Sequence, residues 1–326
     1  MTLRSSLHRA RGSVRVQQQL TRVRQLRNRL VDAPLRQLEY ARRGLVAGDV
    51  DVLLLGDSST LSWSVRDADR TLLPAMLAQR LGNVVSLNGP GFGAGIFAES
   101  LRILGTLKQR PKAVVVTLAL RTSTATHICA HPIVGYPRSL DALARVPGAR
   151  RPIRYIGRGG SRHTPEQMDA YLALPVHTRW SGESTIAEFR RQLKGTGLPP
   201  WPIELERLRF DYFHGELLQP DNPGLQVLTQ LGKQLEEYGV PAVGVWSRPP
   251  IQRGEMHFPG EFEAHVRGQL KMQQDALAIG SSSLGPLLDV DLEDEDFEDS
   301  QNANEHYSFT GRVKVADAIA DAVRSA

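Results

Sequence analysis

The sequence predicts an α/β protein whose parallel sheet is covered by helices on both faces. Short apolar runs, of the length of buried strands, alternate with segments in which apolar residues recur at helical spacing. The chain has 326 residues, of which 41% are hydrophobic and 23% are charged, as in ordinary globular proteins. Strands that alternate with helices imply right-handed crossovers, so the strands are expected to run parallel.

Five apolar runs are the predicted strands. The first, residues 50–55, reads VDVLLL and stops at Gly56. The other predicted strands are residues 84–87, 113–120, 242–246 and 287–290. Helical spacing predicts helices over residues 72–81, 96–107, 225–238, 262–278 and 311–323. The expected fold is therefore a five-stranded sheet with a helix after most of its strands.

Residues 123–222 do not show this alternation of strands and helices. They are rich in proline, glycine and arginine and carry scattered aromatic residues. A structureless loop of this length would be unusual in a compact domain, so part of the segment must pack. We therefore predict one domain over residues 49–326, with an insertion at about 123–222 that forms a lid or a small cap.

Positive charge is concentrated at the N-terminus. Residues 1–43 hold eleven arginines, no lysine and two acids, a net charge of +9, whereas the rest of the chain carries −4. Apolar residues there predict a basic amphipathic helix, broken near Pro34, within an extension over residues 1–48. Such a helix can bind an anionic membrane surface, dock on a partner protein or pack along its own domain. No aromatic platform accompanies the arginines, which argues against nucleic-acid binding.

Several features predict a cytoplasmic protein, with peripheral attachment to a membrane or complex left open by the basic helix. No apolar run is long enough to span a membrane, and no secretory signal is evident. The single cysteine, Cys129, excludes an intramolecular disulfide framework and a cysteine-rich metal site. His127 and His131 lie four residues apart but lack a further ligand, so no metal or other cofactor is predicted.

The strongest chemical signal directly follows the first strand, where the sequence reads Gly56-Asp57-Ser58-Ser59. The carboxyl ends of parallel strands border the ligand crevice of such a sheet. A serine there, at the start of a helix, lies where backbone N–H groups favour developing negative charge. Asp57 is expected to fix the turn around Ser58. A simple helix cap is the alternative, because Asp and Ser are common capping residues.

Two further segments are expected near this serine. The glycine-rich stretch 88–95 follows the second strand, and its glycines would let a backbone N–H approach a substrate oxygen closely. The sequence from His306 to Gly311 enters the last predicted helix. A serine nucleophile needs a base within hydrogen-bond reach, and imidazole is the usual one. Ser58 and His306 are therefore the candidate nucleophile and base.

These segments resemble, in order and spacing, the SGNH hydrolase superfamily, also called GDSL-type esterases. The resemblance covers roughly residues 49–122 and 225–326. It implies a flavodoxin-like, doubly wound three-layer α/β/α fold and a Ser-His-Asp triad. Ser58 would be the nucleophile, with its own N–H in the oxyanion hole, and His306 the base. The motif Asn-x-Gly-x-x-Gly matches residues 88–93 at its first and last positions, which implies Gly93 as a second oxyanion donor.

Two positions depart from the family pattern. Where the family carries an oxyanion asparagine after the third strand, this sequence has Arg121 nearby. A guanidinium there could stabilise an oxyanion or bind an acidic group of the substrate. The second departure is Ala303, which stands three residues before His306 where the family has aspartate.

The partner of His306 is therefore open at this stage. Asp299 is the nearest aspartate and the first candidate for the triad acid, and the other candidates are Asn302, Asn304 and Glu305. Residues 299–302 could instead be the Asp-x-x-His motif with its histidine lost. The spacing of five residues from His306 to Gly311 favours His306 as the base.

The predicted function is hydrolysis of a small acyl ester through a covalent acyl-serine intermediate, in the manner of a carboxylesterase or deacetylase. The same site would serve an O-acyltransferase if an alcohol replaced water as the acceptor. A third interpretation is a non-catalytic binding or scaffold protein on a degenerate fold of this class. A close contact between Ser58 and His306 would favour an enzyme, and an Asn302 that faces Ser58 would favour the scaffold.

Overall fold

The structure, a computed structural model, describes residues 33–64, 66–127, 164–193 and 201–326. Its centre is a parallel four-stranded sheet in the order β2-β1-β3-β6. The strands are β1 (Val52–Gly56), β2 (Val84–Asn88), β3 (Ala113–Ala119) and β6 (Ala242–Ser247). Four of the five predicted strands therefore form, and the predicted α/β class is confirmed.

The fifth predicted strand, residues 287–290, does not form as such. Leu288 makes one parallel bridge to Val245, with its N–H donating to the Gly244 carbonyl over 2.8 Å. Its carbonyl in turn accepts from the Trp246 N–H over 3.0 Å. Pro286 precedes this stretch and cannot donate to a ladder, which helps to limit the pairing to a single bridge.

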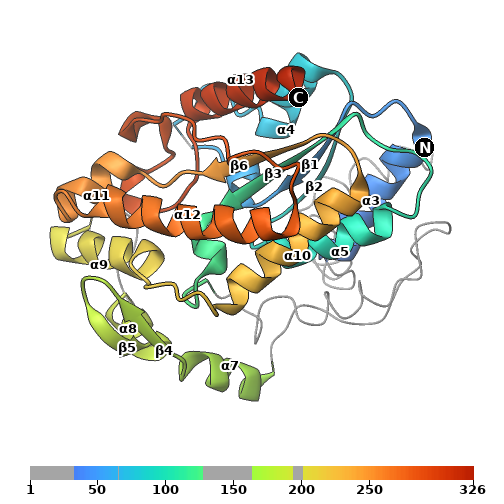
Figure 1. Cartoon of the computed structure of the whole chain (residues 1–326). Helices are drawn as coiled ribbons and strands as arrows, with labels where there is room; N and C mark the ends of the chain where they lie inside the picture. The colour runs from blue at the N-terminus through green and yellow to red at the C-terminus, as the bar shows by residue number, and fades with distance from the viewer. Residues whose placement is uncertain (1–32, 65, 128–163, 194–200) are drawn as a thin grey trace, which may run out of the picture.

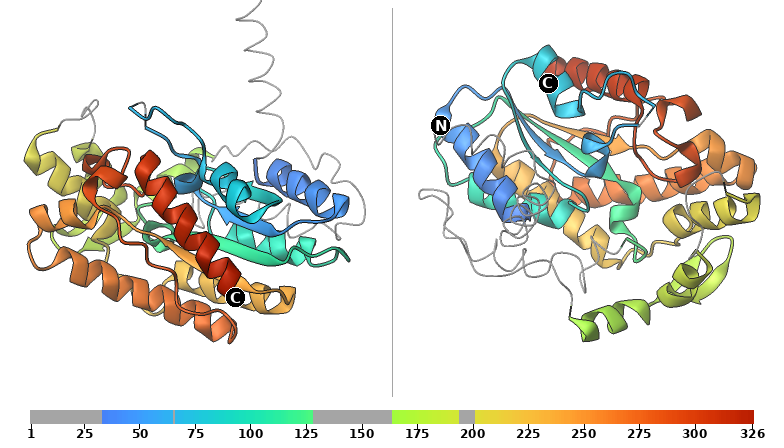
Figure 2. Two further views of the ribbon diagram at one scale, coloured as in Figure 1. Left: turned by 90° about the horizontal axis from the view of Figure 1, so that it is seen from above. Right: turned by 180° about the vertical axis from the view of Figure 1, so that it is seen from behind.

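Helices cover both faces of the sheet (Figures 1 and 2). One face carries α3 (Ala33–Ala47), α5 (Ala94–Leu104), α10 (Pro223–Tyr238) and α12 (Phe262–Gly280), and the other carries α4 (Leu73–Leu81) and α13 (Phe309–Ser325). Alternate residues of β1 point to opposite faces, so Leu53 and Leu55 join the first core while Val52 and Leu54 join the second. Burial on both faces explains the continuous apolar runs.

The chain changes direction across the sheet at β1. From β1 it passes through α4 to β2 on one side, and from β2 it crosses through α5 to β3 on the other. Loops that leave the carboxyl ends of β1 and β3 diverge at such a point and form a crevice. Register supports this arrangement, because Gly56 at the end of β1 lies opposite Asn88 at the end of β2.

The predicted insertion has structure of its own between β3 and α10. It contains α7 (Pro165–Leu172), the antiparallel hairpin β4 (Pro175–Thr178) and β5 (Gly182–Thr185), α8 (Ile186–Gln192) and α9 (Ile203–His214). A small apolar cluster holds these elements together, and it includes Tyr171, Phe189 and Tyr212. Trp180 stacks on Phe258 at 3.8 Å between ring centroids, which fixes the hairpin to the main domain.

One helix of the main domain, α11 (Ile251–His257), was not predicted from the sequence.

Part of the predicted N-terminal extension packs on the domain. In α3, Leu38 is fully buried and belongs to the main core, and Arg42 forms an ion pair with Glu39 on the same helix. Residues 1–32, which carry most of the predicted basic helix, lie outside the described part of the chain. Among the described helices, none has the length and apolar character needed to cross a membrane.

Gly311 allows the last helix to approach the loop before it. A Cβ added at Gly311 would lie 2.1 Å from the carbonyl oxygen of Asp296, and this contact is with backbone that cannot move aside. We expect Gly311→Ala to lower the free energy of unfolding by about 1–3 kcal/mol, as overpacking does elsewhere. In urea unfolding, the matched variant Gly268→Ala, at an exposed helical position with no atom within 4 Å, should be neutral or stabilising by up to about 1 kcal/mol. Equal effects of the two variants would contradict this account.

Candidate functional site

Ser58 begins a single turn of 3-10 helix, Ser58–Leu61, directly after β1. Asp57 caps this turn, because its carboxylate accepts a hydrogen bond from the Ser59 N–H over 2.9 Å. The Asp57 side chain is buried and also contacts the hydroxyls of Ser59 and Ser247. The Asp57 N–H donates to Thr117 Oγ1 over 3.2 Å, which ties the turn to β3. Asp57 thus holds the turn in place, while the half-buried Ser58 remains free to contact other groups.

His306 meets Ser58 at this turn. Its Nε2 lies 3.1 Å from Ser58 Oγ, within hydrogen-bond distance. Nε2 accepts the serine proton when the ring is neutral and carries its own proton on Nδ1. The imidazole is about a quarter exposed, with 27% of the side chain accessible to solvent. Ser58 and His306, which were predicted from the sequence as nucleophile and base, are therefore adjacent in the fold.

The carboxylate nearest to His306 is that of Glu298, which the sequence analysis did not select. Glu298 Oε2 lies 3.6 Å from His306 Nδ1, too far for a hydrogen bond but within ion-pair distance. Phe297 and Tyr307 form an antiparallel bridge, and the Glu298 N–H donates to the His306 carbonyl over 2.8 Å. This pairing of backbone segments brings the two side chains together.

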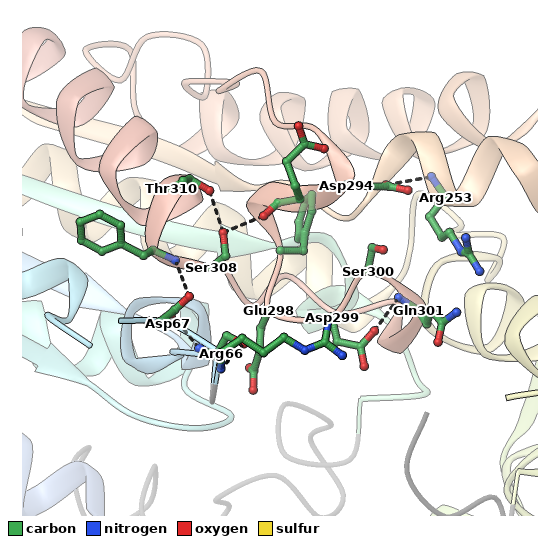
Figure 3. Close-up of a pocket in the computed structure, with 14 residues that line it drawn as sticks. Arg66, Asp67, Arg253, Asp294, Glu298, Asp299, Ser300, Gln301, Ser308 and Thr310 are labelled. Carbon is green, nitrogen blue, oxygen red and sulfur yellow. Dashed lines mark hydrogen bonds between the residues drawn. The ribbon is translucent and has the colours of Figure 1, made fainter. Parts of the chain in front are cut away.

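Asp299 does not occupy the position expected for the triad acid. Its carboxylate accepts the Gln301 N–H over 3.1 Å and caps the short turn Ser300–Asn302 (Figure 3). Burial raises the pKa of Asp299. The reason for the difference is local, because consecutive residues of an extended segment point to opposite sides, and here Glu298 is the one on the side of His306.

The other candidate orienters also have different roles. Asn304 accepts the His306 N–H over 3.3 Å and so shapes the loop rather than the imidazole. Asn302 contacts Arg209 through both its carbonyl and its side-chain oxygen, the latter at 3.2 Å. Its side chain is thus engaged by the insertion.

Arg121 pairs with Glu305, so its charge is already compensated. Its Nε lies 2.7 Å from Glu305 Oε2, although the two groups are not aligned for a hydrogen bond. The Glu305 side chain is only 1% exposed, and burial raises the pKa of this carboxyl. The Arg121 guanidinium also lies 5.2 Å from the centroid of the Phe213 ring. We infer that Arg121 primarily neutralises Glu305 beneath the site.

Gly93 follows β2, the neighbour of β1 in the sheet. It caps the N-terminus of α5 and is buried, and its loop begins where the Gly89 N–H donates to the Gly56 carbonyl over 3.2 Å. Its backbone is extended, with φ of −160°, so conformation does not require glycine here. A Cβ on Gly93 would reach no atom closer than 3.6 Å, on Thr122. The protein's own packing therefore does not explain this glycine either.

A fully buried arginine links the serine and histidine segments. Arg312, in the first turn of α13, donates to Asp67 Oδ2 over 2.9 Å and to the Ser62 carbonyl over 3.3 Å. It also donates to the carbonyls of Tyr307, Asp69 and Thr71. In addition, Ser62 Oγ accepts the Tyr307 N–H over 3.1 Å. These bonds hold the segment after Ser58 against the segment after His306.

A cavity of about 690 Å³ borders the site on the side of Glu298 (Figure 3). Acidic, basic and hydroxyl side chains line it, among them Arg66, Arg253, Asp294, Glu298 and Asp299. Several of these polar groups are bonded to backbone, as in the contact from the Arg253 N–H to Asp294 at 3.2 Å. The described residues contain no group of three His, Cys, Asp or Glu side chains that could hold a metal ion.

Comparison with known protein families and with curated proteins gives no match for this sequence. Of the paired histidines noted in the sequence, His127 is described, and burial lowers its pKa to about 3, so that its ring is neutral. His131 and Cys129 lie outside the described residues.

We expect Arg312→Met to lower the free energy of unfolding by about 3–5 kcal/mol, because it leaves Asp67 buried and unpaired. The matched control is Arg324→Met, which removes an exposed ion pair with Asp321 on the same helix and should change stability by less than about 0.5 kcal/mol. Urea unfolding curves of both variants test this difference. An Arg312→Met variant as stable as the control would show that the buried guanidinium does not hold the two segments together.

Proposed function

We propose that this protein is a serine esterase that hydrolyses an acyl ester through a covalent acyl-serine intermediate. The observation that carries this proposal is the distance of 3.1 Å between Ser58 Oγ and His306 Nε2 at the carboxyl edge of a parallel sheet. A serine hydroxyl is a weak nucleophile unless a base accepts its proton, and an imidazole at this distance is such a base.

In the proposed reaction, His306 Nε2 takes the proton of Ser58 as Oγ attacks the ester carbonyl. The backbone N–H groups of Ser58 and Gly93 stabilise the oxyanion that develops. His306 then returns the proton to the leaving alcohol, and an acyl group remains on Ser58. Water, deprotonated by His306, attacks this acyl-serine and releases the carboxylic acid. Glu298 stabilises the imidazolium in both steps through its contact with Nδ1.

The arrangement of the sheet supports the same proposal. The order β2-β1-β3-β6 equals the first four positions of a flavodoxin-like sheet, and we propose that the Leu288 bridge stands in for the fifth strand. The SGNH hydrolase resemblance places its nucleophile and its histidine where Ser58 and His306 lie. In this interpretation Glu298 replaces the usual aspartate. The contact between Asn302 and Arg209 supports an enzyme rather than a scaffold with Asn302 facing Ser58.

Covalent labelling tests whether Ser58 is activated. We expect a fluorophosphonate probe to give a single adduct on the wild-type protein and none on Ser58→Ala, when read by intact mass. His306→Ala should slow labelling by about 10²–10⁴-fold, because it removes the general base.

Ser300→Ala is the matched control for this experiment. Ser300 lines the neighbouring cavity but does not contact His306, so its replacement should leave labelling unchanged. An adduct that persists in Ser58→Ala, or a wild-type protein that fails to react under conditions that label a control esterase, would refute the proposal.

A second experiment identifies the acid that assists His306. With 4-nitrophenyl acetate as substrate, we expect Glu298→Gln to lower kcat/KM by about tenfold or more, since about 1.4 kcal/mol of lost transition-state stabilisation corresponds to a factor of ten. Asp299→Asn should have a smaller effect, because that carboxylate caps a turn. The reverse order of the two effects would return Asp299 to the role of triad acid.

A further inference from the structure

The insertion brings a second arginine to the site. Arg209 lies on α9 and donates to Asn302, four residues before His306 in the sequence, over 3.2 Å. His214, one turn further along α9, lies with its Nε2 2.7 Å from the carbonyl of Ala303, the next residue of that loop. Burial lowers the pKa of His214 to about 3, so the ring is neutral and Nε2 donates. Hydrogen bonds from Arg209 and His214 therefore fix α9 to the loop that carries His306.

Two arginines share one aromatic ring at this contact. The Arg209 guanidinium lies 5.4 Å from the centroid of Phe213, and that of Arg121 lies 5.2 Å from the same centroid. Arg209 also stacks on Trp201, at 4.2 Å from the ring centroid. Stacking orients a guanidinium and leaves its edge available for a ligand. Arg121 follows β3 at the carboxyl edge of the sheet, and Arg209 contacts the loop that carries His306.

Among the described residues, no carboxylate lies within ion-pair distance of Arg209. Arg121 has Glu305 as its partner, whereas none of the described carboxylates forms an ion pair with Arg209, and its buried Nε has no described acceptor. Asp299 attracts Arg209 through space, but burial and the charge of Arg121 lower the pKa of Arg209.

A half-buried cation without a close ion-pair partner is unfavourable, and an arriving anion relieves this cost. We propose that Arg209 is a specificity-determining residue that binds an anionic group, a carboxylate or a phosphate, on the substrate. This inference rests on the proposed esterase function. If that function holds, the substrate is an acyl ester that carries a negative charge outside the ester bond. A guanidinium suits both groups, because its N–H donors match pairs of carboxylate or phosphate oxygens.

Direct binding tests the site independently of catalysis. The experiment uses the Ser58→Ala chain, which binds but does not turn over, and follows tryptophan fluorescence because Trp201 stacks on Arg209. Glutarate and inorganic phosphate are titrated separately at constant ionic strength, and the tighter-binding probe identifies the anion. We expect saturable binding that Arg209→Gln weakens by roughly tenfold to a hundredfold and that Arg209→Lys weakens less.

Arg207→Gln is the matched control, since Arg207 is an exposed arginine on the same helix that stacks on Phe258 instead. It should bind the probes as the parent does. Absence of binding in the parent, or equal binding in Arg209→Gln and the parent, would overturn the proposal. Failure of fluorophosphonate labelling would refute the esterase while leaving this titration interpretable.

Kinetics give the second readout. Two esters of matched length, 4-nitrophenyl pentanoate and the 4-nitrophenyl monoester of glutarate, differ in one carboxylate. We expect Arg209→Gln to reduce the ratio of kcat/KM for the anionic ester to that for the neutral ester by roughly tenfold or more, mainly through KM. Arg207→Gln should keep the ratio of the wild type. A ratio that is the same in Arg209→Gln and wild type would show that Arg209 does not select an anion on the acyl side.

Discussion

Burial of one positive charge fixes the geometry of the site. The Arg312 side chain has no exposed surface, and a cation in that position is tolerated only if acceptors surround it. Those acceptors are Asp67 and the carbonyls of four residues, and they come from the segment after the serine turn and from the segment after His306. Satisfying Arg312 therefore requires these two parts of the chain, about 245 residues apart, to lie side by side. The contact between Ser58 and His306 is a consequence of that requirement.

The sheet supplies the second constraint, on the serine side. Asp57 lies at the end of β1, and the groups that hold it, Thr117 and Ser247, lie on β3 and β6. The apolar interior of the sheet thus ends in a small network of hydroxyl and carboxylate groups at one edge. A buried carboxylate with several donors is rigid, because each lost hydrogen bond would leave a polar group unsatisfied. Ser58 is held at the rim of this network and can contact His306 and solvent.

The features that could be read from the sequence are those with a local signal. Four strands were predictable because burial on both faces gives continuous apolar runs. The apolar run at 287–290 forms only one bridge to the sheet, so such a run does not by itself identify a strand. Ser58 was predictable because it begins a helical turn directly after a strand, and His306 because it lies at a recognisable spacing before the last helix. Glu298 reaches His306 through a backbone bridge between Phe297 and Tyr307, and such pairing fixes no sequence spacing. For the same reason no pattern in the sequence distinguishes Arg209 from the many other arginines.

The arrangement of charges around His306 gives a reason for Arg121. Two carboxylates, Glu298 and Glu305, lie near the imidazole, but they differ in exposure: 34% of the Glu298 side chain is accessible, against 1% for Glu305. An uncompensated charge on Glu305 would be costly and would add to the negative charge of Asp57, which itself raises the pKa of Glu305. Arg121 removes that cost, as an uncharged asparagine could not. In the proposed mechanism, Glu298 is then the carboxylate that acts on Nδ1. The proposed site thus has a serine, a base and an acid, while the positive charge of Arg121 stabilises the loop that carries Glu305 and His306.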